Sequence, residues 1–134
     1  MAEARDVSVL SGADQQQIIA VVRRADELAT ARDVDGYLAL TTPDMVLDGT
    51  QGAASGRDAV RSAIGGIWAA EPVGTRHVTS DVVVTPGDDA TADARSTLTL
   101  VEADGGVRAV ASISQSLRKA GGTWLIARRS VDGG

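Results

Sequence analysis

The chain has 134 residues, a net charge of −5 and a sequence pI of about 4.7, and 43% of its residues are hydrophobic. These values fit one globular domain, and the acidic balance with very few aromatic residues argues against nucleic acid or an anionic membrane as a partner. Because the chain has no cysteine, disulfides, thiolate metal sites and cysteine nucleophiles are excluded.

The first ten residues read as a flexible lead-in, and residues 11–134 as a single domain. The lead-in lacks the apolar core of a signal peptide, and no apolar run is long enough to cross a bilayer. We therefore expect a cytoplasmic protein.

Helical signals come first along the chain. The Ser11-x-x-Asp14 pattern predicts a helix start, and apolar residues then recur at helical spacing as far as Ala29. The segment Asp33–Gly36 should break this helix. A shorter helix should follow, with Tyr37 available for burial, and it should end before Pro43 because the residue before proline is driven out of the helical region.

A short apolar strand is expected next, over Met45–Gly49, with Asp48 at its tip. A second capping pattern, Ser55-x-x-Asp58, predicts a helix that ends near Trp68. The pair Gly65–Gly66 inside it suggests close packing or a bend. Strand, glycine-rich loop and helix together suggest the mouth of a pocket.

The rest of the chain reads as strands. Turn residues such as Asp104-Gly105-Gly106 separate them, and connections this short predict antiparallel neighbours. Ala92, Ala94, Ser96, Leu98 and Leu100 alternate onto one face. Helices followed by a meander are typical of the α+β class. The four expected strands are residues 75–85, 90–103, 107–119 and 123–131.

The order of these elements resembles SnoaL-like proteins of the nuclear transport factor 2-like superfamily, which share a cystatin-like fold with ketosteroid isomerase. The resemblance implies a cone in which N-terminal helices pack on a curved antiparallel sheet around an apolar pocket. It also implies a homodimer through the outer sheet face, where the 90–103 strand is rich in threonine. The matching passages are residues 31–40, 43–48, 56–60, 76–80 and 124–126.

The resemblance places Asp48 near the general base of ketosteroid isomerase. Because Val46 shares its face and is apolar, we expect Asp48 to look into the cavity, where a carboxylate can move protons. The alternative is a turn aspartate that holds the loop before Gly49. The isomerase tyrosine of the first helix aligns near Ala25, so steroid isomerisation is not expected.

His77, the one histidine, is the second catalytic candidate and the expected partner of Asp48, because SnoaL-like proteins often carry a histidine early in this strand. Its alternative is a strand histidine with a structural hydrogen bond. A single histidine without cysteines offers too few ligands for a metal, and no cofactor is expected. Candidate binding residues are Tyr37, Val46, Trp68 and Trp124, although burial in the core explains the aromatic ones equally well.

Two functions therefore stand side by side. One is an enzyme doing cofactor-free acid–base chemistry, of isomerase, cyclase or hydrolase type, on a small apolar organic substrate. The other is a ligand-binding or accessory dimerisation module without catalysis. The sequence does not distinguish them.

Overall fold

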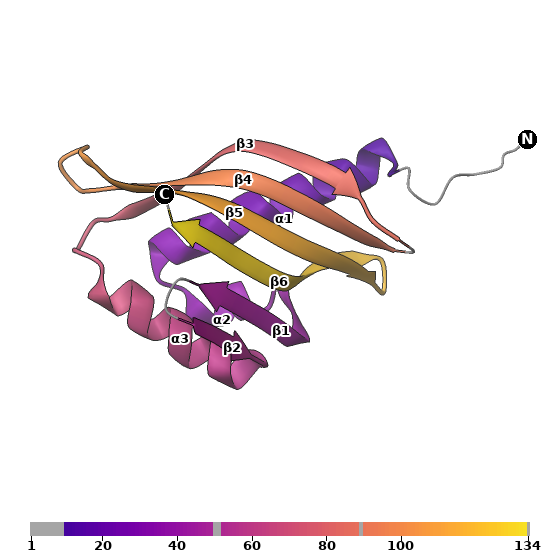
Figure 1. Cartoon of the computed structure of the whole chain (residues 1–134), viewed down its shortest axis with the longest axis horizontal. Helices are drawn as coiled ribbons and strands as arrows, with labels where there is room; N and C mark the ends of the chain where they lie inside the picture. The colour runs from indigo at the N-terminus through magenta and orange to yellow at the C-terminus, as the bar shows by residue number, and fades with distance from the viewer. Residues whose placement is uncertain (1–9, 50–51, 89, 134) are drawn as a thin grey trace, which may run out of the picture.

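The computed structural model describes residues 10–49, 52–88 and 90–133, so the expected lead-in lies almost wholly outside the described residues. Within them, three helices pack on one six-stranded sheet (Figure 1). The helices are α1 (Gly12–Ala31), α2 (Val34–Leu38) and α3 (Arg57–Ala70). The strands are β1 (Thr41–Gly49), β2 (Gly52–Ser55), β3 (Arg76–Pro86), β4 (Thr91–Val101), β5 (Val107–Ala120) and β6 (Thr123–Gly133).

The sheet has the strand order β2-β1-β6-β5-β4-β3. The four strands predicted after residue 74 are all present and pair antiparallel with their sequence neighbours, as the short turns require. β1 lies beside β6 and parallel to it, which is an exception to the predicted antiparallel sheet. Strand β2, which the sequence reading left inside a loop, pairs antiparallel with β1. The α+β class and the cystatin-like architecture are confirmed.

Helix α1 begins where the sequence predicts it. The Ser11 side chain accepts a hydrogen bond from the backbone N–H of Asp14 at 3.0 Å. Its apolar stripe, with Ile18, Val22 and Ala25 fully buried, packs across the sheet on the side away from the viewer in Figure 1. We call this the inner face of the sheet.

Helix α3 begins differently from the prediction. Ser55 belongs to β2, and the residue before the helix is Gly56, which has φ +88° and makes no side-chain cap. A positive φ suits glycine, so the chain turns here through backbone freedom instead of a capping serine. No atom lies within 4 Å of where a side chain on Gly65 or Gly66 would begin, so the pair does not mark close packing.

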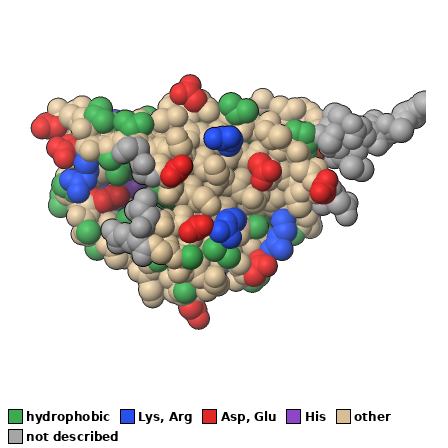
Figure 2. Space-filling view, in the orientation of Figure 1, with side chains coloured by type: hydrophobic (Ala, Val, Ile, Leu, Met, Phe, Trp, Pro, Cys, Tyr) green, Lys and Arg blue, Asp and Glu red, His purple; other side chains and the backbone are tan. Residues whose placement is uncertain are grey.

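The two faces of the sheet carry different side chains. The predicted alternation of β4 is confirmed, with Ala92, Ala94, Ser96 and Leu98 buried on the inner face. On the opposite, outer face, charged side chains of both signs are scattered among polar and apolar ones (Figure 2). Within the described residues, no helix is long and apolar enough to cross a membrane.

Candidate functional site

A cavity of about 520 Å³ lies between α3, the β1–β2 hairpin and the inner face of β3 to β6. Most of its lining is apolar, and three side chains in it are charged or titratable, namely Glu71, His77 and Arg129. A mostly apolar cavity with a few convergent polar groups is the usual form of a small-molecule site. The apolar lining includes Leu47, Ala54, Ile64, Ile67, Trp68, Leu98, Leu100, Ala109, Ala111 and Val131.

Small residues leave this space open. Gly49, Gly52 and Ala53 line one wall at the β1–β2 turn, and Ala109 and Ala111 line another on β5. Helix α3 supplies the larger side chains. Ile67 is half exposed although it shares the apolar stripe of the helix, because it borders the cavity instead of the core.

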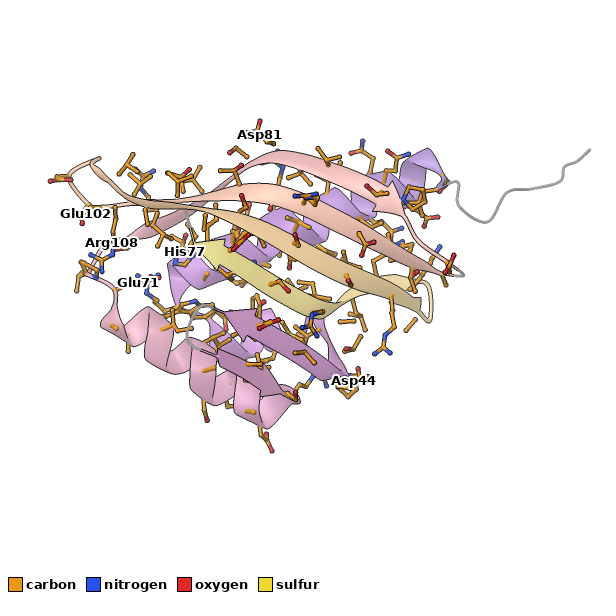
Figure 3. All side chains as sticks on the ribbon, viewed as in Figure 1. Asp44, Glu71, His77, Asp81, Glu102 and Arg108 are labelled. Carbon is orange, nitrogen blue, oxygen red and sulfur yellow. The ribbon has the colours of Figure 1, made fainter. Side chains whose placement is uncertain are left out.

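His77 stands at the start of β3 and lines the cavity. Its ring meets Trp68 edge to face, with centroids 6.5 Å apart, and its Nε2 lies 2.9 Å from Glu71 Oε1. Figure 3 shows Glu71 and His77 side by side beyond the end of α3. The side chain of His77 is 5% exposed and that of Glu71 is 8% exposed, so the pair is shielded from bulk water.

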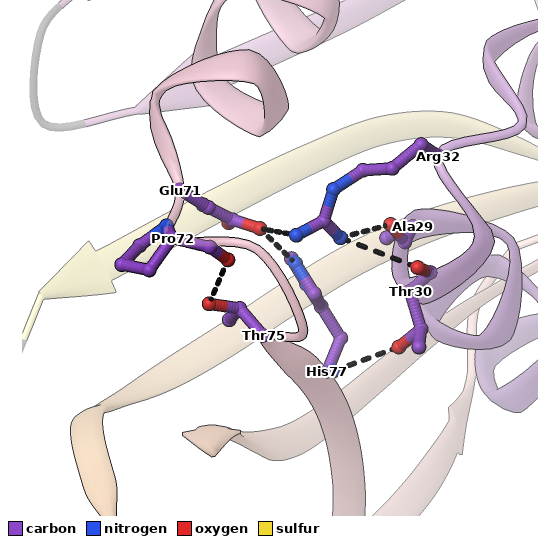
Figure 4. Close-up of polar contacts among 7 residues, drawn as sticks. All are labelled: Ala29, Thr30, Arg32, Glu71, Pro72, Thr75 and His77. Carbon is purple, nitrogen blue, oxygen red and sulfur yellow. Dashed lines mark hydrogen bonds and ion pairs between the residues drawn. The ribbon is translucent and has the colours of Figure 1, made fainter. Parts of the chain in front are cut away.

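Arg32 is the second partner of the Glu71 carboxylate. Its Nη2 lies 2.9 Å from the same carboxylate oxygen, and its Nη1 donates to the carbonyl of Ala29 at 2.6 Å (Figure 4). The backbone N–H of His77 donates to Thr30 Oγ1 at 2.8 Å. The end of α1, the end of α3 and the start of β3 are therefore tied together at this point.

These contacts indicate the tautomer of His77. A carboxylate beside Arg32 accepts hydrogen bonds, so the neutral ring donates through Nε2–H and keeps its lone pair on Nδ1. Nδ1 is buried and has no hydrogen-bond partner within the described residues. An imidazole with an oriented Nε2–H and a free Nδ1 is suited to act as a general base.

Asp48 lies outside this site, and the orientation expected from Val46 is wrong. Both faces of β1 are apolar at this point, and Met45 and Leu47 are the ones that turn inward. Leu47 lines the cavity. Asp48 is part-exposed and binds Arg128 instead, with Arg128 Nη2 donating to Asp48 Oδ2 at 2.7 Å. The expected pair of Asp48 with His77 does not form, and Glu71 takes the position beside the histidine.

One of the four candidate binding residues lies in the cavity wall, and the other three lie elsewhere. Trp68 lines the cavity, whereas Val46, Tyr37 and Trp124 are not part of its wall. Tyr37 is buried beneath Trp68, with ring centroids 5.8 Å apart. Trp124 is buried in the core, and its indole N–H donates to Asp14 Oδ1 at 3.0 Å.

Two charged residues of the cavity were missed by the sequence reading. Glu71 stands before Pro72 at a helix end, where acids are usually solvated. Arg129 follows an irregularity in the β5–β6 pairing between Ser116 and Leu117, so it points inward although the alternation from Trp124 and Ile126 would turn Arg128 inward. Sequence periodicity gives no warning of such a bulge.

The described part of the chain holds no cluster of three or more side chains suited to a metal ion. Residues 11–130 match the model of the SnoaL-like domain. The chain belongs to the SnoaL-like domain family. No curated protein matches this SnoaL-like protein in sequence.

Solved structures similar to this SnoaL-like protein share its cystatin-like, nuclear transport factor 2-like fold. A protein of unknown function from Nostoc punctiforme is 25% identical, with a TM-score of 0.87 and coverage of 93% of this chain and 94% of that one. A putative scytalone dehydratase from Novosphingobium aromaticivorans is 18% identical, with a TM-score of 0.78 over 91% and 85% of the two chains. ActVI-ORFA from Streptomyces coelicolor is 17% identical, with a TM-score of 0.78 over 90% and 97%.

Proposed function

We propose that this SnoaL-like protein binds a small, largely apolar organic molecule in the cavity and moves a proton on it without a cofactor. The observation that carries the proposal is the His77 ring in the cavity wall, with Nε2 held by Glu71 and Nδ1 left without a partner. His77 is the base, and Glu71 and Arg32 are positioning residues. One structural neighbour is named a putative scytalone dehydratase, so this fold is associated there with a reaction on a small organic molecule.

His77 and Glu71 together can carry out the proton transfer. Nδ1 of His77 is buried in the unliganded protein, so the ring has to turn toward the cavity when substrate binds. Nδ1 then takes a proton from carbon next to a carbonyl group, and the electron pair of the C–H bond moves into the carbonyl to give an enolate. The imidazolium ion that forms is stabilised by the Glu71 carboxylate 2.9 Å from Nε2. Return of the proton to the same or another atom completes an exchange or an isomerisation.

Deuterium exchange tests this function without knowledge of the natural substrate. The protein is incubated in heavy water with 1-indanone, a small ring ketone, and loss of the proton signal next to the carbonyl is followed by NMR. We expect exchange faster than in buffer, and we expect His77→Gln to slow the protein-dependent rate by about 10²-fold because general-base catalysis is worth about that much. Circular dichroism checks that each variant is folded.

Two further variants serve as a control and as a test of Asp48 as the alternative base. Asp44→Asn alters an exposed acid that pairs with Arg118 on the surface and should not change the exchange rate. A loss of exchange in Asp48→Asn together with an unchanged rate in His77→Gln would move the base to Asp48. No exchange above buffer with the wild-type protein would contradict the enzyme and favour the second candidate, a non-catalytic ligand-binding module.

The second candidate has an observation of its own. The Arg32–Glu71–His77 contacts join the ends of α1 and α3 to β3, which is also what a structural clamp does. In that case, His77→Gln lowers the melting temperature and leaves ligand binding intact.

For the assembly we propose a homodimer through the outer sheet face. Val78, Thr99 and Val110 lie opposite one another in the β3–β4–β5 register, and Val110 is 47% exposed. Exposed apolar side chains in a row favour association with a second copy.

A further inference from the structure

Arg129 brings a positive charge into the wall of the largely apolar cavity. It lies on β6 and lines the cavity, and its side chain is 10% exposed. It pairs in the parallel register with Leu47 of β1, which is another lining residue. Gln115 lies directly opposite Arg129 on β5 but is not part of the cavity wall. Of these two polar residues, Arg129 is therefore the one that a bound molecule can reach.

Asp26 on α1 engages the guanidinium only in part. Its Oδ1 lies 3.5 Å from Arg129 Nη1, which is longer than the roughly 2.7–2.9 Å of a strong hydrogen bond between charged groups. Thr79 donates to the other oxygen of Asp26 at 2.5 Å. Within the described residues, Asp26 is the ion-pair partner of Arg129, and a guanidinium has five N–H donors. Arg129 therefore keeps donors for an oxygen atom of a ligand.

Helix α1 sets the separation between this guanidinium and His77. Thr30 accepts a hydrogen bond from the backbone N–H of His77, and Asp26, four residues earlier on the helix, contacts Arg129. Side chains four residues apart on a helix begin about 5–6 Å from each other. Thr79, which donates to Asp26, is two residues after His77 and on the same face of β3. The guanidinium and His77 are thus about one helical turn apart, a gap that a small carbonyl compound can span.

Stability alone does not explain a buried ion pair in this position. Taking two charges out of water is costly, and apolar residues of the same volume often serve the fold as well or better. The side chains of Arg129 and Asp26 are only 10% and 4% exposed. A fixed cation with unused N–H donors, shielded from water and facing a cavity, is what stabilises an oxyanion. The charge of Arg129 is therefore better explained by a role in the cavity.

We propose that Arg129 is a second catalytic residue, which binds the carbonyl oxygen of the ligand and stabilises the enolate formed when His77 removes the neighbouring proton. The C–H bond breaks, its proton goes to His77, and its electron pair moves into the carbonyl. Arg129 donates hydrogen bonds to the resulting oxyanion and transfers no proton. This inference rests on the proposed function and specifies the orientation of the ligand, with the oxygen at Arg129 and the acidic C–H at His77.

The ionisation of 4-nitrophenol tests the oxyanion site without turnover, because its phenolate carries negative charge on oxygen and absorbs visible light. The phenol is titrated with pH in the presence of an excess of the full chain. We expect the bound phenol to ionise about one pH unit below the free phenol, since a nearby cation favours the charged form. Arg129→Met should abolish this shift. Arg128→Met is the matched control, because it changes the neighbouring arginine, which pairs with Asp48 at the surface, and it should keep the shift.

Heavy-water exchange of 1-indanone gives the second readout. We expect Arg129→Met to slow the protein-dependent rate by about 10²-fold, the usual effect of removing one oxyanion donor. Because this variant leaves the Asp26 charge buried without its partner, it loses stability. The double variant Asp26→Asn/Arg129→Met removes both charges and should show the same loss of exchange while circular dichroism shows a folded protein. Asp26→Asn alone keeps the cation without its counter-charge, so bound 4-nitrophenol should ionise at a still lower pH.

The outcomes separate this role from the proposed function. If the folded double variant exchanges 1-indanone as fast as the wild type, and the ionisation of bound 4-nitrophenol is unchanged, Arg129 has no catalytic role and His77 remains the base. A loss in Arg128→Met as large as that in Arg129→Met also overturns the assignment. A wild-type protein that neither exchanges 1-indanone nor binds 4-nitrophenol overturns the proposed function and the oxyanion site together.

Discussion

At the scale of single residues, Tyr37 shows how burial changes the chemistry of a side chain. It is the only tyrosine, and its hydroxyl is buried with no partner among the described residues. Burial raises the pKa of Tyr37 above its ordinary value of 10.0, and the smaller effect of Arg129 opposes that shift. The folded state therefore favours the neutral phenol. This preference stabilises the fold below the ordinary pKa, and the stabilisation is lost as the pH rises through the raised pKa of the folded state.

Alkaline titration tests this directly. Ultraviolet absorbance of tyrosinate should appear only above the pH at which a free tyrosine ionises, and it should rise together with the loss of structure seen by circular dichroism. Ionisation near pH 10 with the fold intact would show that Tyr37 reaches solvent. Tyr37→Phe supplies the control, since it removes the absorbance change and keeps the ring that packs on Trp68.

The candidate site shows what single residues in a sequence can predict. His77 was singled out by the family resemblance and as the one histidine, and Trp68 as one of two tryptophans. Both lie in the cavity wall. The orientation of Asp48 was misjudged because Met45, Val46 and Leu47 are all apolar, so alternation does not say which face of β1 is buried. Gln115 was not singled out, because a buried glutamine has the same sequence appearance as an exposed one.

At the scale of elements, the start of α1 is fastened to the β5–β6 hairpin by Asp14. Trp124 Nε1 and Lys119 Nζ contact its carboxylate oxygen at 3.0 Å and 2.9 Å. The hydrogen bond from Trp124, followed by that from Lys119, lowers the pKa of Asp14 from 3.8 to about 2. A carboxylate with a lowered pKa stabilises the fold fully above the ordinary pKa, and this contribution is lost as the pH falls through about 2.

Replacing this acid should therefore have a pH-dependent effect. At neutral pH we expect Asp14→Asn to melt at a lower temperature than the wild type, and the difference should shrink below about pH 4 and disappear near pH 2. Thermal melts followed by circular dichroism measure it. Asp35→Asn is the control, since the Asp35 ion pair with Arg61 is solvent-exposed and surface pairs contribute little. A difference that persists unchanged at pH 2 would assign the effect to packing instead of charge.

The sequence predicted some of the elements and missed others. The strands after residue 74 were located closely, because turn glycines and prolines separate them. Strand β2 was missed because Gly52–Ser55 is short and rich in small residues, and it forms a strand only through its pairing with β1. The Arg129 side chain points inward because the register between β6 and β5 is irregular. Such a register depends on how two strands pair, so the sequence of one strand does not predict it.

At the scale of the whole molecule, the two faces of the one sheet differ in their side chains. The inner face carries the cavity, and the outer face of β3 to β5 carries the Val78–Thr99–Val110 row. The sequence predicted the fold through the family resemblance, because the order of helices and strands is shared with structures of low sequence identity. It did not predict that Gln115 and Arg129 lie opposite each other on β5 and β6, since this depends on how the two strands pair.

The outer face leads to the prediction for the assembly. Light scattering on the purified protein at micromolar concentration should give twice the mass of the 13.7 kDa chain. Val110→Lys should shift the protein to monomer, because a two-fold interface contains the changed residue twice and each copy buries a charge without a partner. Val73→Lys is the matched control. Val73 is 96% exposed and lies in the turn before β3, so the same substitution there should leave the dimer intact. A wild-type protein that is monomeric at this concentration would contradict the dimer and leave Val78 and Val110 as ordinary exposed surface.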